Sequence, residues 1–210
     1  MRRAASQRVL RTEGFSKSEA SKIPILPSKL FYEKCNHTPR YWKKKDAFWF
    51  SYLKDELEKF GYEVWLPQLP NDEHPNLKEW IPFILSGGTF TEETVLIGHS
   101  AGAQVILSIL ENIDIKIKKA LLVSGHAKLL REDAGGKNEK EPNWDVIKAH
   151  AEEFIFINSD NDPWGCDATQ GKILADNLGG RLIIRHDGHM GSTTYNQPYT
   201  EFPLLIELIK

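Results

Sequence analysis

Residues Thr94 to Leu110 read T-V-L-I-G-H-S-A-G-A-Q-V-I-L-S-I-L, and the rest of the chain can be placed around them. An apolar run leads into Gly98-His99-Ser100-Ala101-Gly102, and apolar residues at helical spacing follow. A strand, a tight turn and a helix in this order are the context in which G-x-S-x-G forms a nucleophile elbow. A side chain at Gly98 or Gly102 would press on the neighbouring strand or helix, so we expect both glycines to provide room. Ser100 is therefore the candidate nucleophile, and an ordinary strand-to-helix turn is the alternative.

Strands alternate with helices on both sides of this turn. Several predicted strands, such as residues 119–124 and 154–158, are apolar on both faces, which is typical of a parallel sheet covered on both sides. Further strands are predicted at residues 62–66 and 181–185. The pattern predicts an α/β fold, a three-layer α/β/α sandwich with a mainly parallel sheet, whose active site lies at the carboxyl ends of the strands.

The helices carry more specific local signals. In the first, Phe50, Leu53, Leu57 and Phe60 are expected to form one buried stripe, with Asp46 as N-cap and Gly61 as the terminating residue. Pro82 lies inside the second helical pattern and predicts a kink or a later helix start. Asp167 and Gln170 form a capping-box pattern before a helix whose apolar face is expected to contain Ile173, Leu174 and Leu178.

The composition is that of an ordinary globular protein. The 210 residues include 40% hydrophobic and 27% charged residues with a net charge of −2, which does not favour nucleic-acid binding. We expect residues 1–22 to form a disordered tail and residues 23–210 a single domain, in which Leu30-Phe31-Tyr32 could open a strand. The apolar runs are too short to span a membrane.

The cysteines and motifs bear on location and cofactors. Cys35 and Cys166 are interpreted as free thiols in a reducing compartment, which favours a cytoplasmic protein. The Arg- and Ser-rich start of the chain also fits a mitochondrial presequence, the less favoured alternative. No H-E-x-x-H, C-x-x-C or Walker pattern is present, so we expect neither a metal nor another cofactor.

A serine nucleophile needs a base and an orienting acid, in the chain order Ser, Asp, His. Asp160 and Asp162 both follow a predicted strand, and the residues alone leave the choice between them open. His186 and His189 follow the next strand, and the Gly-flanked position of His189 favours it as the base.

Other residues near the elbow have expected roles in binding. The backbone N–H of Ala101, at the start of a helix, is expected to stabilise a developing oxyanion, with a second donor near Asn36. His99 is expected to pack beneath the turn or to line the pocket. Trp164, beside the acidic loop, is a candidate pocket residue, and a surface position is the alternative.

At the level of whole motifs the chain resembles the small α/β-hydrolases related to retinoblastoma-binding protein 9 and their bacterial relatives. The resemblance runs from about Trp49 to the C-terminus. It is carried by these stretches: W-F-S-Y-L-K-D-E-L, G-Y-E-V, L-P-N-D-E-H-P-N-L-K-E-W, G-H-S-A-G, L-V-S-G-H-A-K, N-W-D-V-I-K, S-D-N-D-P and D-G-H-M. It implies an α/β-hydrolase fold without a substantial lid and a triad of Ser100, Asp162 and His189. Cys35-Asn36-His37-Thr38 stands where the family has a Gly-rich loop, and only Asn36 has a counterpart in some relatives.

Two functions follow as expectations. The first is a carboxylesterase-like serine hydrolase that cleaves small-molecule esters or amides through an acyl-enzyme on Ser100. The second is an interaction protein on a hydrolase scaffold with weak or lost activity and an unknown protein partner.

Overall fold

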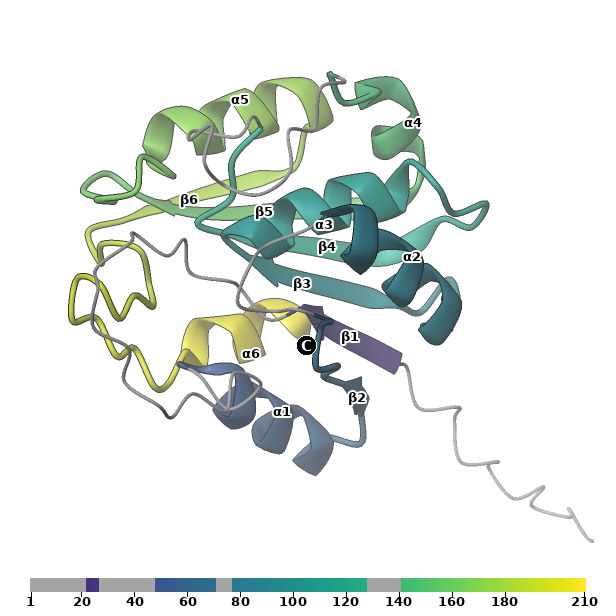
Figure 1. Cartoon of the computed structure of the whole chain (residues 1–210), viewed down its shortest axis with the longest axis horizontal. Coiled ribbons are helices and arrows are strands. Elements are labelled where there is room, and N and C mark those ends of the chain that lie inside the picture. Colours follow the sequence, from purple (N-terminus) through teal and green to yellow (C-terminus); the bar gives the residue numbers. More distant parts are fainter. Residues whose placement is uncertain (1–21, 27–47, 71–76, 128–140) are drawn as a thin grey trace, which may run out of the picture.

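The structure, a computed structural model, describes residues 22–26, 48–70, 77–127 and 141–210. The expectations for residues 1–21 of the tail, for a strand at Leu30-Phe31-Tyr32, for Cys35 and for Asn36 fall outside these residues. The expected end of the tail at Lys22 is wrong, because Lys22 is the first residue of a strand that extends to Leu26. Figure 1 shows a central sheet with helices on both faces, so the described chain forms the predicted three-layer sandwich.

The sheet has six strands, and every pairing between them is parallel. Their order is β2-β1-β3-β4-β5-β6. The strands are β1 (Lys22–Leu26), β2 (Glu63–Trp65), β3 (Val95–His99), β4 (Ile117–Val123), β5 (Ala151–Ser159) and β6 (Arg181–Arg185). The chain passes from β1 to β2 on one side and then to β3 on the other. The strand order therefore reverses beside β3, and ligands bind at such a switch point in open α/β sheets.

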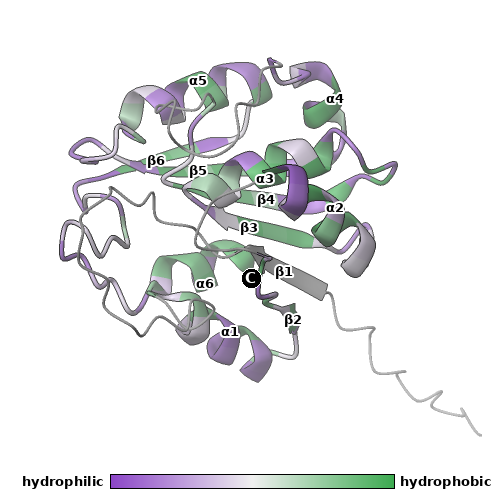
Figure 2. Cartoon of the chain, viewed as in Figure 1, coloured by the Kyte–Doolittle hydropathy of each residue, from purple (hydrophilic) through white to green (hydrophobic). Residues whose placement is uncertain are grey.

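The helices are α1 (Phe50–Lys59), α2 (Leu77–Gly87), α3 (Ala101–Leu110), α4 (Trp144–Ala149), α5 (Ala168–Leu178) and α6 (Pro203–Ile209). In Figure 1, α2, α3, α4 and α5 cover one face of the sheet, and α1 and α6 cover the other. In Figure 2 the central strands are mainly hydrophobic and the hydrophilic colours lie on the outer helices and loops. No helix within the described ranges has the length and apolar character needed to cross a bilayer.

Neighbouring residues of the buried strands belong to two different cores, because successive side chains point to opposite faces of a sheet. Leu96, Leu122 and Phe156 pack toward α3. Ile97 and Val123 pack toward α1 and α6. A strand enclosed in this way must be apolar at every position, which explains the continuous apolar runs in the sequence.

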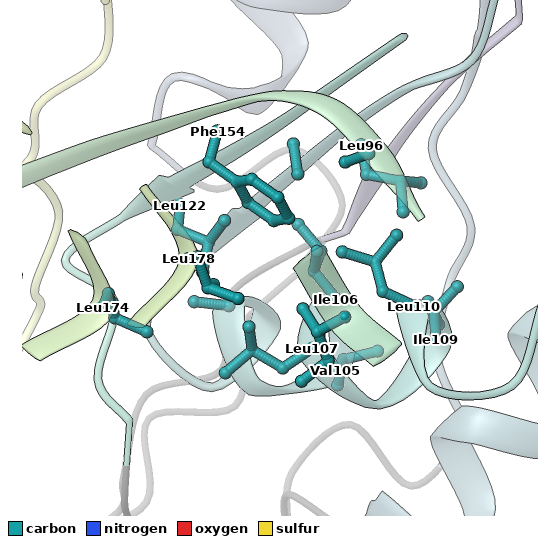
Figure 3. Packing of buried hydrophobic residues seen from close by; sticks show 14 of the residues in the cluster. Leu96, Val105, Ile106, Leu107, Ile109, Leu110, Leu122, Phe154, Leu174 and Leu178 are labelled. Carbon is teal, nitrogen blue, oxygen red and sulfur yellow. The ribbon is translucent and has the colours of Figure 1, made fainter. Parts of the chain in front are cut away.

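Helix α3 is buried along its whole length, from Ala101 to Leu110. Figure 3 shows its apolar side chains against those of the sheet and of α5, including Leu122, Phe154 and Leu174. A helix enclosed on all sides gives a rigid support to the turn that precedes it.

Strand register brings the functional strand ends to one level. His99 pairs with Val123, Val123 pairs with Ile157, and Ile157 pairs with Ile183. The loops that leave β3, β4, β5 and β6 therefore start from nearly the same row across the sheet.

Several local predictions at the helices are wrong. Helix α1 begins at Phe50 with Trp49 at the N-cap position, whereas the expected cap, Asp46, lies outside the described residues. Phe60 is 53% exposed instead of buried, because the helix ends before it, and the ammonium group of Lys210 lies 3.7 Å from its ring centre. Gly61 has φ +86° directly after this end, as the C-terminal signal predicts.

Two further corrections concern α2 and α5. The later helix start predicted from Pro82 is wrong, because α2 begins at Leu77 and continues through Pro82 to Gly87. Pro82 has no N–H to donate to the carbonyl of Lys78, and both residues are on the exposed side, where water can reach that carbonyl. On α5, Leu174 is buried as expected, but Ile173 is 37% exposed.

Candidate active site

Ser100 occupies a strained turn between β3 and α3. Its φ is 56° and its ψ is −118°, a conformation that side-chain-bearing residues rarely adopt. A Cβ atom added at Gly98 would lie 2.5 Å from the carbonyl oxygen of Gly102 and 2.8 Å from Cδ1 of Ile106. Such distances are sterically forbidden, so Gly98 provides the room that the sequence pattern predicts.

The side chain of Ser100 is buried. The residue is 1% exposed, and its Oγ has no hydrogen-bond partner within the described parts of the chain. Ala101 is the first residue of α3, and the first N–H groups of a helix have no acceptor inside the helix. The N–H of Ala101 therefore lies where an oxyanion donor is expected, whereas Asn36 is outside the described residues.

Asp162 and His189 form a buried pair. Nδ1 of His189 lies 2.7 Å from Oδ2 of Asp162, and the two side chains are 4% and 0% exposed. The second carboxylate oxygen of Asp162 accepts a hydrogen bond of 2.8 Å from the backbone N–H of Trp164. Both oxygens of the carboxylate are thus engaged, which fixes its orientation and leaves Nε2 of His189 as the ring atom that can exchange a proton.

The competing candidates lie elsewhere. Nδ1 of His186 is 2.6 Å from Oδ1 of Asp160, and these side chains are 77% and 55% exposed. The structure therefore pairs the two alternatives with each other at the surface and places Asp162 and His189 together in the interior.

His99 packs beneath the turn, the first of its two expected positions. It is 1% exposed, and its ring lies among those of Phe48, Trp49 and Phe50. Burial lowers the pKa of His99 well below its usual value, and the neighbouring His189 lowers it further. The neutral ring donates from Nε2 to the carbonyl oxygen of His189 at 2.7 Å.

The loop that carries His189 is anchored through its backbone by residues that sequence reasoning did not identify. Oγ of Ser124 donates to the carbonyl oxygen of His189 at 3.0 Å. The backbone N–H of His189 donates to Oε1 of Gln197 at 2.8 Å. Oδ1 of Asn161 accepts from the N–H of Gly188 at 2.9 Å. Trp49 donates from Nε1 to the carbonyl of Met190 at 3.0 Å.

Only some of these anchors have a sequence signal. Asn161 lies inside the S-D-N-D-P motif, and Ser124 lies in the motif after β4. Nothing in the local sequence distinguishes Gln197 from a surface residue. Its role depends on the loop folding back onto His189.

Trp164 lies at one side of the buried pair. Its ring centre is 6.3 Å from that of His189, and its Nε1 donates to Oγ of Ser192 at 3.1 Å. Tyr195 packs edge-on against it at 5.3 Å between ring centres. Trp164 is half-buried and lies beside the candidate base, where its ring can form one wall of a pocket.

One group among the described residues has side chains that could hold a metal ion: Asp162, Cys166 and His189, whose ligand atoms lie within 4.8 Å of one another. Two of these atoms are already joined by the hydrogen bond between Asp162 and His189. Burial raises the pKa of the Cys166 thiol well above its usual value, and the carboxylates of Asp162 and Asp167 raise it further. A metal would have to break the hydrogen bond and remove the thiol proton, so the donor set fits an acid–histidine pair better than a metal centre.

Comparison with known proteins places this chain among hydrolases. A family model described as serine hydrolase matches residues 38–209. The serine hydrolase RBBP9 of Rattus norvegicus is 27% identical over 154 residues, which cover 71% of this chain and 81% of that protein. The hydrolase YdeN of Bacillus subtilis is 35% identical over 173 residues, covering 77% and 86%.

Solved structures show the same fold. The ydeN gene product of B. subtilis has a TM-score of 0.73 at 23% identity, covering 90% of this chain and 97% of that one. Alpha/beta hydrolase domain-containing protein 10 from mouse has a TM-score of 0.57 at 11% identity, covering 85% and 86%. The described chain thus has the α/β-hydrolase fold.

Proposed function

The chain belongs to the serine hydrolase family, and from this we propose that it cleaves small carboxylic esters or amides through an acyl-enzyme on Ser100. The observation that carries the proposal is the buried hydrogen bond between His189 and Asp162. The loop that carries His189 is in turn hydrogen-bonded to His99, the residue before Ser100. These are the parts that nucleophilic catalysis by a serine requires.

The proposed reaction has two halves. Oγ of Ser100 attacks the substrate carbonyl carbon while Nε2 of His189 takes the hydroxyl proton, and the imidazolium is stabilised by Asp162. The N–H of Ala101 stabilises the oxyanion together with a second donor near Asn36. His189 then returns the proton to the departing alkoxide or amine. Water, activated by the same ring, attacks the acyl group and releases the acid and Ser100.

The decisive experiment removes one hydroxyl. Hydrolysis of p-nitrophenyl acetate and labelling by a fluorophosphonate probe are measured for the wild type and for Ser100→Ala. We expect the variant to lose labelling completely and its kcat to fall by about 10⁴-fold or more, since triad members act as a unit.

Ser108→Ala is the matched control. Ser108 is also buried on α3 but lies two turns beyond the elbow. It should retain both labelling and turnover. An unlabelled wild type, or undiminished labelling of Ser100→Ala, would rule out the hydrolase mechanism and favour an interaction protein on this scaffold.

We also propose a cytoplasmic location. It is supported by Cys166, a buried free thiol, which is typical of proteins in a reducing compartment.

A further inference from the structure

We propose that His99 and Ser124 act together as positioning residues for His189, by holding the backbone carbonyl of that residue with two hydrogen bonds. The inference rests on the proposed function, because it assigns a role relative to His189 as the general base. We call this pair of donors the carbonyl brace.

The brace joins three strand ends. His99 is the last residue of β3, and Ser124 directly follows β4. Nε2 of His99 lies 2.7 Å and Oγ of Ser124 lies 3.0 Å from the same carbonyl oxygen. A carbonyl oxygen has two lone pairs, so the two donors together fill its capacity. The loop after β6 is thereby attached to both central strands.

The His99 bond also connects the residue next to the candidate nucleophile with the candidate base. His99 is joined to Ser100 by a peptide bond, and its ring is joined to His189 by one hydrogen bond. The ring centres of the two histidines lie 4.8 Å apart. His99, the residue next to Ser100, would therefore directly oppose a shift of the His189 loop.

His99 is suited to this role because its ring has little freedom to move. Trp49 packs edge-on against it at 5.9 Å between ring centres, and the side chain is buried. The other ring nitrogen, Nδ1, has no hydrogen-bond partner among the residues that the structure describes. The single polar contact of this buried ring in the described structure is thus the one to His189.

Positioning matters here because proton transfer needs Nε2 of His189 within about 3 Å of Oγ of Ser100. Asp162 holds the ring at Nδ1, but it does not hold the backbone from which the ring extends. A misplacement of about 1 Å in a catalytic group can lower the rate by about 100-fold. We therefore expect loss of the brace to lower kcat and to leave substrate binding nearly unchanged.

A pair of variants of similar length separates hydrogen bonding from packing. In His99→Gln the amide nitrogen is as many bonds from Cα as Nε2 is, so the donor is retained. In His99→Met the side chain has similar reach but no donor. We expect kcat on p-nitrophenyl acetate to fall by about 10- to 100-fold in His99→Met. KM should change less than about threefold, and His99→Gln should recover most of the loss.

Ser124→Ala tests the second donor. Alone it should lower kcat modestly, because His99 still holds the carbonyl. Combined with His99→Met it should lower kcat by more than the product of the two single effects, since both donors share one acceptor.

A control shows whether any histidine that is hydrogen-bonded to a backbone carbonyl would behave in this way. Nδ1 of His150 lies 2.8 Å from the carbonyl oxygen of Leu110, at the opposite end of α3 from the elbow. His150→Met should lower the melting temperature and leave kcat unchanged.

A readout independent of activity is the amide ¹⁵N shift of Met190, whose peptide group contains the braced carbonyl. It should move in His99→Met and return toward the wild-type value in His99→Gln. Wild-type kcat and an unmoved Met190 signal in His99→Met, or equal losses in the Met and Gln variants, would overturn the brace. Persistent hydrolysis by Ser100→Ala would instead overturn the proposed function, and the Met190 shift would still test the brace.

Discussion

Ser100 owes its strained backbone to the residues around it. A φ of 56° is unfavourable for serine, and the turn persists because β3 and the fully buried α3 hold its two ends. This conformation also requires that the turn approach α3 closely. The approach is possible because Gly98 has no side chain.

The first prediction belongs to this scale. Gly98→Ala should lower the free energy of unfolding by more than about 3 kcal/mol or abolish labelling of Ser100, because the new methyl group meets backbone atoms that cannot move aside. Gly61→Ala is the control: Gly61 has φ +86°, but nothing lies within 4 Å of an added Cβ. It should cost only about 1 kcal/mol, for the left-handed conformation. Urea denaturation of both variants measures the difference, and equal costs would contradict the steric explanation.

At the scale of elements, helix ends were predictable where a local signal sets them. The side chain of Asp167 accepts hydrogen bonds from the N–H groups of Thr169 and Gln170, at 2.8 and 3.4 Å, so the start of α5 is set by a side-chain cap. The reciprocal half of the predicted capping box is replaced by another contact. Oε1 of Gln170 accepts from the N–H of Ala127 and ties α5 to the loop after β4.

A substitution at this cap has a defined expected cost. Asp167→Ala should lower the free energy of unfolding by about 1 kcal/mol, because two N–H groups lose their acceptor. Asp167→Asn keeps an acceptor oxygen and should retain most of the stability. Thermal and urea unfolding distinguish the two variants, and an equal loss in both would mean that charge, and not the cap, is what matters.

For the whole molecule, the neutral state of His99 links folding to pH. The folded pKa of His99 lies well below its unfolded value of about 6.5, because the ring is buried and next to His189. The full contribution to stability is present above the unfolded pKa. As the pH falls below about 6.5, the unfolded chain binds a proton that the folded chain excludes, so stability decreases.

The corresponding measurement compares unfolding across pH. Between the two pKa values, His99 should make the wild type lose up to about 1.4 kcal/mol of stability per pH unit. In His99→Gln this contribution is absent, so the difference in stability between the two proteins should shift in favour of the variant from pH 7 to pH 5. Parallel curves for the two proteins would contradict a neutral buried His99.

Pattern and spacing along the chain were sufficient for the α/β alternation, the parallel sheet and the elbow at Ser100. The alternation and the sheet follow from the periodicity of apolar residues, and the elbow follows from glycines that act on their immediate neighbours. Position after a strand also identified two acids and two histidines as candidates, but it could not by itself separate the acids. Asp160 and Asp162 are two residues apart, and their carboxylates have different partners in the loop after β6, where His186 lies at the surface and His189 inside.

The same limit explains the residues that were missed. Folding brings three anchors to the backbone of the His189 loop. Gln197 and Ser124 are 8 and 65 positions from His189 in the chain, and Trp49 is 141 positions from Met190. The start of α1 depends likewise on a distant segment, because Trp49 at its N-cap position is bonded to Met190. Residue type shows that a hydrogen bond can be made, whereas its partner is chosen by the distances that the folded chain creates.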